Sequence, residues 1–241
     1  MAAPRRRLSR AAAALSLALA SWSVPPAHAS CPSLFAGGTS LDGAAARAHA
    51  EWIDAHLAVT AHSARIWTWS WGGGIGASGV ASLAVVPFVA KADRIDWYTS
   101  AGSAAVGVLP FLLAPLAVMD DSKALHQRLA ALPAGASEGD VCALLTDAES
   151  KLVRDAEDER SQQRWYVHVG NLAFNTGVML FLGLGYHRWE SGIINGVAGA
   201  VVGEALILTQ PNATVDEAAA YRSGREPPGG PRLAIGYANR F

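Results

Sequence analysis

The sequence predicts an all-α membrane protein with four transmembrane helices in two hairpins, a periplasmic helical cap and a short extended C-terminal tail. Hydrophobic residues make up 51% of the 241 residues and charged residues only 16%, whereas soluble domains carry about 25% charged residues. Four apolar stretches each approach the ~20 residues that a membrane-spanning helix needs. Aromatic residues gather at the ends of these stretches, where rings with one polar edge favour the headgroup level of a bilayer.

The first thirty residues have the pattern of a secretory signal. Four arginines between residues 5 and 10 form a basic segment, residues 11–24 are apolar, and residues 27–29 (Ala-His-Ala) supply a cleavage site. The apolar run is too short to cross a ~30 Å hydrocarbon core. We therefore predict that 1–29 is a cleaved signal peptide. A lipidated Cys31 is an alternative, although His28 stands where such signals normally have Leu.

Residues 30–66 are expected to form a periplasmic amphipathic helix. Apolar side chains recur there at helical spacing, and the charged residues fall elsewhere on the helical wheel. The apolar positions are Ala46, Ala50, Ile53, Leu57, Ala61 and Ala64.

Two transmembrane hairpins are predicted, at residues 67–119 and 167–209. In the first, the apolar stretches 72–90 and 97–119 are joined by residues 91–96. In the second, the stretches 167–186 and 191–209 are joined by residues 187–190. Links as short as these force neighbouring helices to lie antiparallel.

The segment 120–166 between the hairpins is predicted to be a periplasmic helical segment. Pro133 and Gly135 separate two helices, and Ser137 with Asp140 three residues later resembles a helix start. Leu144, Leu145, Ala148 and Leu152 form an apolar stripe on the second helix. Residues 154–164, which are polar on all sides, are expected to be a solvated helix.

The last segment, 210–241, is predicted to be a periplasmic tail. Its final residues alternate apolar and other side chains up to the terminal Phe241, which is typical of a strand. Such an ending also occurs in outer-membrane barrels, so the outer membrane is kept as an alternative location. A barrel needs at least eight alternating strands, and the helical segments of this chain do not supply them.

The two cysteines, Cys31 and Cys142, are predicted to form a disulfide. A cleaved signal would leave the mature N-terminus outside, which places both cysteines in the oxidising periplasm, where disulfides persist. The predicted location is the bacterial inner membrane with both termini periplasmic. Two unrelated thiols are the alternative.

Glycines spaced four apart are predicted to let the membrane helices approach closely. These glycines are Gly72, Gly76, Gly192, Gly196, Gly199 and Gly203. Residues 74–79 also match a dinucleotide-binding fingerprint, but that motif requires a preceding strand, and here a Trp-rich segment precedes it.

An intramembrane polar cluster is the candidate functional site. Glu204 lies inside the fourth apolar stretch, where a carboxylate is costly unless it faces a partner. His168, Asn171 and Asn175 form one polar stripe on the third stretch. Counting residues from the turn places Asn175 at the depth of Glu204, so we expect a contact between these two side chains.

The sequence favours a non-enzymatic structural or interaction component of the cell envelope. A small transporter or channel-like module that uses the cluster around Glu204 is the alternative. No catalytic constellation is evident in the sequence, and no cofactor or metal is expected. Among the histidines beyond the predicted signal peptide, only His187 has a candidate second metal ligand at helical spacing, Glu190, and this pair lies in a tight turn. The expected partner is the lipid bilayer, with a homo-oligomer or other envelope proteins also considered. A net charge of −1 gives no reason to expect nucleic acid.

Overall fold

The computed structural model describes residues 30–34 and 40–224. The predicted signal peptide and the predicted C-terminal strand lie outside these residues. The described chain is almost entirely helical. Its helices are α1 (Gly43–Val85), α2 (Arg94–Leu113), α3 (Val118–Ala131), α4 (Glu138–Gln162), α5 (Trp165–Tyr186), α6 (Trp189–Leu208) and α7 (Ala213–Arg222), with the short 3₁₀ turns η1 (Val86–Phe88) and η2 (Lys91–Asp93). The strands β1 (Cys31–Pro32) and β2 (Ser40–Leu41) pair antiparallel.

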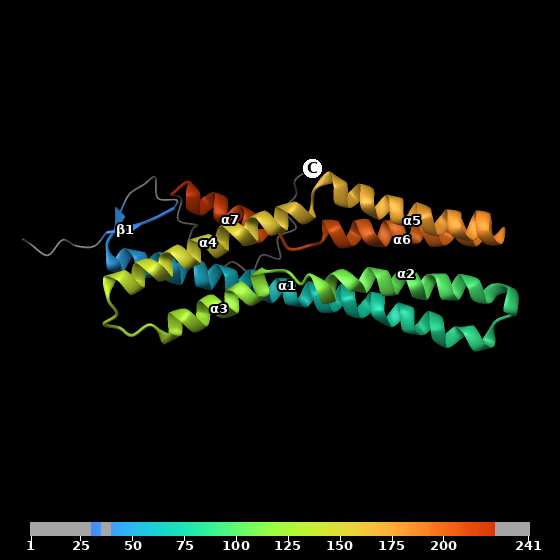
Figure 1. Ribbon diagram of the computed structural model, residues 1–241, viewed down its shortest axis with the longest axis horizontal. Helices are drawn as coiled ribbons and strands as arrows, with labels where there is room; N and C mark the ends of the chain where they lie inside the picture. Colours follow the sequence, from blue (N-terminus) through green and yellow to red (C-terminus); the bar gives the residue numbers. More distant parts are fainter. Residues whose placement is uncertain (1–29, 35–39, 225–241) are drawn as a thin grey trace, which may run out of the picture.

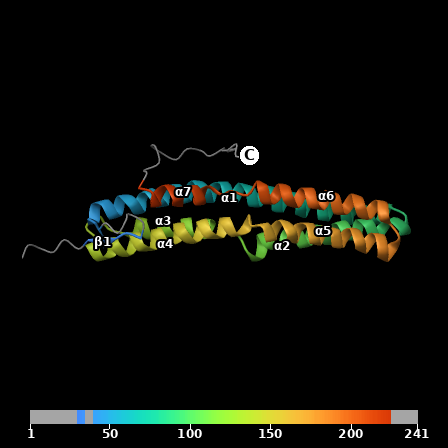
Figure 2. The same ribbon diagram turned by 90° about the horizontal axis from the view of Figure 1, so that it is seen from above.

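Four helices are long and apolar enough to cross a membrane, which is consistent with the predicted all-α membrane protein. In the elongated molecule, α2, α5, α6 and the C-terminal half of α1 lie at one end, and the other helices lie at the opposite end (Figures 1 and 2). Most residues in the apolar windows of these four helices are not buried inside the protein. Their outward faces therefore suit contact with lipid.

The opposite end is a four-helix bundle, called the head bundle below, formed by α3, α4, α7 and the N-terminal half of α1. It has the molecule's main apolar core, as expected for helices with one apolar stripe. The fully buried aliphatic side chains include Ile53, Leu57, Leu125, Leu144 and Leu152. The apolar stripes predicted for residues 46–64 and 144–152 are both buried in this core.

The helix starts follow ordinary capping chemistry. The Asp42 carboxylate accepts a hydrogen bond from the backbone N–H of Ala45 at 2.7 Å. Ser137 Oγ accepts from the N–H of Asp140 at 3.2 Å, which confirms the helix start predicted there. Such caps satisfy N–H groups that have no partner within the helix.

Only α1 runs unbroken from the head bundle into the apolar end of the molecule. The other three passages are interrupted: α2 ends at Leu113 before Pro115, α4 ends at Gln162 before α5, and α6 ends at Leu208 before α7. Proline at 115 cannot donate the N–H that a continuing helix would need. The single helix Gly43–Val85 includes both the amphipathic segment and the first apolar stretch, which the sequence pattern had separated.

The second half of α4 differs from the expectation of a solvated helix. Asp155 is 1% exposed and Glu159 is 2% exposed. The prediction was wrong because α7 packs against α4 and covers this face. A polar sequence pattern alone does not reveal such a cover.

Candidate functional site

The predicted polar cluster joins α5 to α6. Glu204 accepts a hydrogen bond from Asn171 Nδ2 at 2.9 Å on one carboxylate oxygen. Its other oxygen lies 2.6 Å from His168 Nδ1. Asn171 Nδ2 also reaches the carbonyl oxygen of Ala200 at 3.0 Å. Both oxygens of the Glu204 carboxylate therefore have partners on the neighbouring helix.

Asn175 belongs to the same network but does not occupy the predicted place. Its Nδ2 donates to the backbone oxygen of Asn171 at 2.9 Å and to the Oδ1 of that residue at 2.8 Å. The expected contact with Glu204 is thus made by Asn171, one helical turn away. The reason is the turn between the helices: α5 ends at Tyr186 and α6 begins at Trp189, so the hairpin centre lies two residues before the point used for the depth count.

The glycines of α6 make this network possible. A Cβ at Gly199 would overlap Asn175 Oδ1, and a Cβ at Gly203 would overlap Asn171 Oδ1. Nearer the turn, a Cβ at Gly196 would lie 2.9 Å from the carbonyl oxygen of Asn175. All three positions therefore need glycine so that the helix backbones and the asparagine side chains can fit together.

The glycines of α1 pack less tightly. A Cβ at Gly72 would meet Phe111 at 3.4 Å, and one at Gly76 would meet Val108 at 3.8 Å, which is ordinary van der Waals contact. Gly192 of α6 contrasts with them, because its Cβ would lie 2.7 Å from the carbonyl oxygen of Met179. Glycines spaced four residues apart therefore occur both where two helix backbones pack very closely, as at Gly192, and where the helices pack at an ordinary distance, as at Gly76.

His168 and Glu204 form a pair that can hold a proton. Each side chain is 30% exposed, so the pair lies at the surface of the α5/α6 helix pair. The pair can also act as a hydrogen-bonded bridge between two helices. The sequence analysis placed both residues in the cluster but expected Asn175, and not His168, to contact Glu204.

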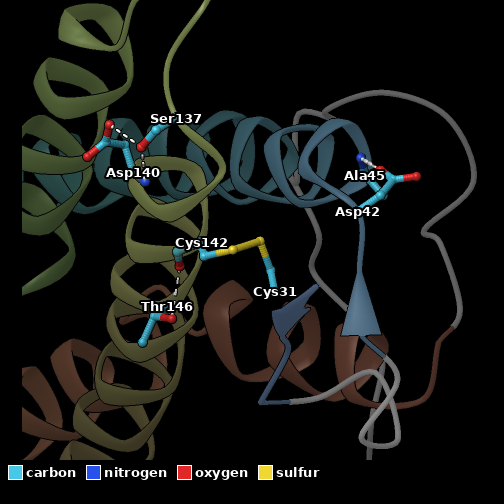
Figure 3. The surroundings of a disulfide bond; sticks show 7 residues. All are labelled: Cys31, Asp42, Ala45, Ser137, Asp140, Cys142 and Thr146. Atoms are coloured by element: carbon cyan, nitrogen blue, oxygen red, sulfur yellow. Dashed lines mark hydrogen bonds between the residues drawn. A yellow bond between two sulfur atoms is a disulfide. The ribbon is translucent and has the colours of Figure 1, made fainter. Parts of the chain in front are cut away.

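Cys31 and Cys142 form the predicted disulfide, which ties β1 to the second turn of α4 (Figure 3). Neighbouring contacts reinforce this attachment. Ser33 Oγ donates to Glu149 at 2.5 Å, and the N–H of Leu34 donates to the same carboxylate at 2.7 Å. The hydroxyl of Tyr221 also donates to Glu149, at 2.8 Å, so α7 joins the contact.

Buried carboxyl groups inside the head bundle escaped the sequence analysis. Neither carboxylate oxygen of Asp155 has a hydrogen-bond partner within the described part of the chain. Burial, with Asp121 nearby, raises the pKa of Asp155 well above its usual range. Burial also raises the pKa of Glu159 to about 8 and that of Glu217 to about 7. These groups are therefore largely neutral below neutral pH.

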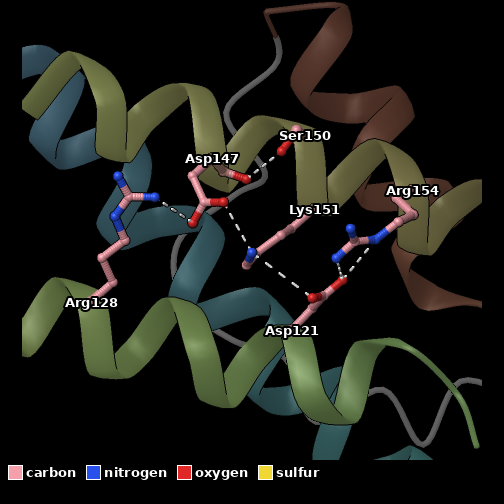
Figure 4. A network of polar contacts seen from close by, with 6 residues as sticks. All are labelled: Asp121, Arg128, Asp147, Ser150, Lys151 and Arg154. Carbon is pink, nitrogen blue, oxygen red and sulfur yellow. Dashed lines mark hydrogen bonds and ion pairs between the residues drawn. The ribbon is translucent and has the colours of Figure 1, made fainter.

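A charged network lies where α3 meets α4 (Figure 4). Arg154 forms an ion pair with Asp121. Lys151 Nζ lies 3.0 Å from Asp147 and 3.9 Å from Asp121, and Arg128 lies 3.1 Å from Asp147. The Asp147–Lys151 pair lies within α4, whereas Arg154 joins α4 to α3.

A second polar cluster, at the turns that connect the apolar helices, was also missed. The Arg188 guanidinium lies 2.8 Å from Asp93 and 2.6 Å from Asp96. Ser191 Oγ donates to Asp96 at 3.0 Å. These contacts fasten the turn after α5 to the turn before α2. The sequence signal that could have revealed them was the presence of opposite charges in the two short links.

Within residues 30–34 and 40–224, no group of three or more His, Cys, Asp or Glu side chains is placed to hold a metal ion. The candidate site is therefore the polar contact between α5 and α6, together with its titratable pair. Comparison of the chain with protein-family models, with curated proteins and with solved structures finds no match.

Proposed function

We propose that the protein is a structural or interaction component of the bacterial cell envelope, anchored by two transmembrane hairpins and carrying the head bundle in the periplasm. The observation that supports this most directly is the Glu204 carboxylate. Both of its oxygens are satisfied by α5, as expected for interhelical hydrogen bonds that hold a membrane bundle together. The disulfide supports the periplasmic placement, because such bonds persist in oxidising compartments.

Reporter fusions test this placement. Fusions after Asp96 and after His187 are expected to report cytoplasm, and a fusion after Ser137 is expected to report periplasm. The reverse pattern would put the disulfide in a reducing compartment and would refute the proposed orientation.

A proton-handling transport module is the second candidate, and the His168–Glu204 pair favours it. The two side chains are 2.6 Å apart, which is close enough for a proton to pass between them. Intramembrane ionisable residues are frequently part of ion or proton pathways.

Two substitutions at Glu204 separate these candidates. Glu204→Gln keeps a hydrogen-bonding group of the same shape, so a structural role predicts nearly normal stability and a normal envelope phenotype. Glu204→Leu would leave Asn171 and His168 without their partner, at a cost of about 1–2 kcal/mol. Thermal melting in detergent would measure the stability of each variant, and an envelope-integrity assay would measure its phenotype in cells. Glu190→Gln, an exposed position at the other end of α6, is the matched control.

The outcome that contradicts the structural proposal is a Glu204→Gln protein that is stable but inactive in cells. An amide cannot titrate, so this result would assign proton transfer to the pair.

A further inference from the structure

A cavity of about 200 Å³ lies between the α1/α2 pair and the α5/α6 pair, where these helices meet the head bundle. Both helix pairs contribute to its wall, as do the last residue of α4 and the link between α2 and α3. The apolar side chains that line it include Trp67, Phe111, Leu116, Val167, Leu206 and Ile207. An apolar cavity of roughly 150 Å³ stays dry and binds a molecule the size of benzene. This cavity is therefore large enough for a segment of hydrocarbon.

One polar side chain in the wall is left without a partner. Gln210 is 6% exposed, and its Nε2 has no hydrogen-bond acceptor in the described part of the chain. The backbone of the same residue is held, because its N–H donates to Ile207 and its carbonyl oxygen accepts from Gln163. A buried donor without an acceptor costs about 1–3 kcal/mol. The occupant that would relieve this cost carries an oxygen acceptor beside its hydrocarbon.

The position of the cavity along the molecule narrows the choice of occupant. Trp67 and Trp71 donate their indole N–H groups to Thr209, the residue next to Gln210, at 3.3 and 3.0 Å. Indole rings favour the boundary between hydrocarbon and headgroups. At that boundary a phospholipid has its ester carbonyls, directly above its acyl chains.

The cavity is open on one flank. Pro110, Ala114 and Pro115 line it there and are exposed. Its volume is below the ~300–1,000 Å³ of sites that enclose a whole small molecule. It therefore suits the upper part of a longer chain that enters sideways from the bilayer.

We propose that this cavity binds one acyl chain of a bilayer phospholipid, with the ester carbonyl accepting a hydrogen bond from Gln210. Water fits less well, because a buried water needs two to four polar partners and the wall is mostly apolar. The inference rests on the apolar helices spanning a membrane and is independent of the role of Glu204.

The first experiment measures where lipid contacts the protein. The full chain in nanodiscs would be exposed to phosphatidylcholine that carries a photoactivatable diazirine near the carbonyl end of one acyl chain. Peptide mapping is expected to find stronger labelling at Phe111 and Leu206 than at Leu109 and Leu112, which are exposed and lie outside the cavity wall. Ala114→Trp, which fills the open flank, is expected to lower the labelling of the wall at least fivefold. Leu112→Trp, on the exposed face of the same helix, is the control and should leave it unchanged.

The second experiment tests the hydrogen bond and does not depend on the bulky variant folding. Native mass spectrometry would compare retention of a diester phosphatidylcholine with that of its diether analogue, which lacks the carbonyl. Wild-type protein is expected to retain the diester about fivefold better, the size of one ordinary hydrogen bond. Gln210→Leu should abolish this preference, whereas Gln127→Leu, on the exposed surface of α3, should preserve it.

Uniform labelling of wall and lipid-facing residues would overturn the proposal. So would equal retention of diester and diether lipid by the wild-type protein, or a preference that survives in Gln210→Leu.

Discussion

The head bundle and the α5/α6 pair are stabilised by different means, although both are made of packed helices. The head bundle buries leucine and isoleucine side chains and adds a disulfide, as suits a bundle that water surrounds. The α5/α6 pair buries little apolar surface. Glycines bring its backbones close enough for Asn171 on α5 to donate hydrogen bonds to Glu204 and to the carbonyl oxygen of Ala200 on α6.

The difference follows from the solvent that each region is built for. Water drives leucines together, whereas lipid tails are as apolar as leucine and give no such driving force. Close van der Waals contact and polar bonds must then hold the helices. A substitution in one region should therefore change the stability of that region and leave the stability of the other unchanged.

Removal of the disulfide is expected to have the largest effect. The bond closes a loop with a sequence separation of 111 residues, for which chain-entropy estimates give about 4–5 kcal/mol. We expect Cys31→Ser with Cys142→Ser to cost about 2–4 kcal/mol, because membrane insertion already restricts the unfolded chain. Detergent melting with and without reductant measures the cost. Protection from proteolysis should fall in the head bundle and persist in α5 and α6. Equal loss in both regions would mean that they do not unfold separately.

Substitution of a tightly packed glycine should destabilise the α5/α6 pair and leave the head bundle unchanged. Gly192→Ala would place a methyl group 2.7 Å from the Met179 carbonyl oxygen, so the backbones must separate. The expected cost is about 1–3 kcal/mol. Gly76→Ala is the control, because its methyl group would meet Val108 at an ordinary 3.8 Å. The measurement is the melting temperature of each variant in detergent. A Gly192→Ala protein as stable as the control would show that close approach is not what holds this pair.

The pH dependence of stability should belong to the head bundle. The pKa values of Asp155, Glu159 and Glu217 are raised by burial, those of the glutamates to about 8 and about 7, whereas unfolded carboxyl groups titrate near pH 4. Between these values the folded chain binds more protons than the unfolded chain. The free energy of unfolding therefore falls as the pH rises from about 4 to about 8.

Asp155→Asn should weaken this dependence, because an amide stays neutral at every pH. We expect it to stabilise the head bundle by about 1–3 kcal/mol at pH 9 and to change little at pH 4. Melting curves over this pH range provide the measurement. Stability that rises with pH in the wild-type protein would show that these groups are ionised in the folded state.

The smallest effect is expected at the turn between α5 and α6. His187 has a φ of 57°, in the left-handed region that costs a side-chain-bearing residue about 1–2 kcal/mol. Glycine removes this strain but gives the unfolded chain more freedom. His187→Gly should therefore stabilise the pair by about 0.5–1 kcal/mol, with no change in the head bundle. A destabilised variant would point to a contact of the imidazole that outweighs the strain.

The sequence predicted those features that depend on local pattern or on compartment. The apolar helices, the stripe of α1 and the pairing of Cys31 with Cys142 are of this kind. The partner of Glu204 was misplaced by one turn because a two-residue turn cannot be distinguished from a four-residue turn by hydropathy. The buried Asp155 and Glu159 could not be predicted, since their burial depends on α7, which is more than fifty residues away along the chain.

The continuity of α1 has a mechanical consequence. With 43 residues and a rise of 1.5 Å per residue, it is a rod about 65 Å long. The other passages into the head bundle are interrupted between helices. A rotation of the head bundle by about 10° would move the far end of α1, which lies ~27 Å beyond Trp67, by about 5 Å. The helix thus acts as a lever arm, which would transmit a force on the head bundle to the far end of the apolar helices.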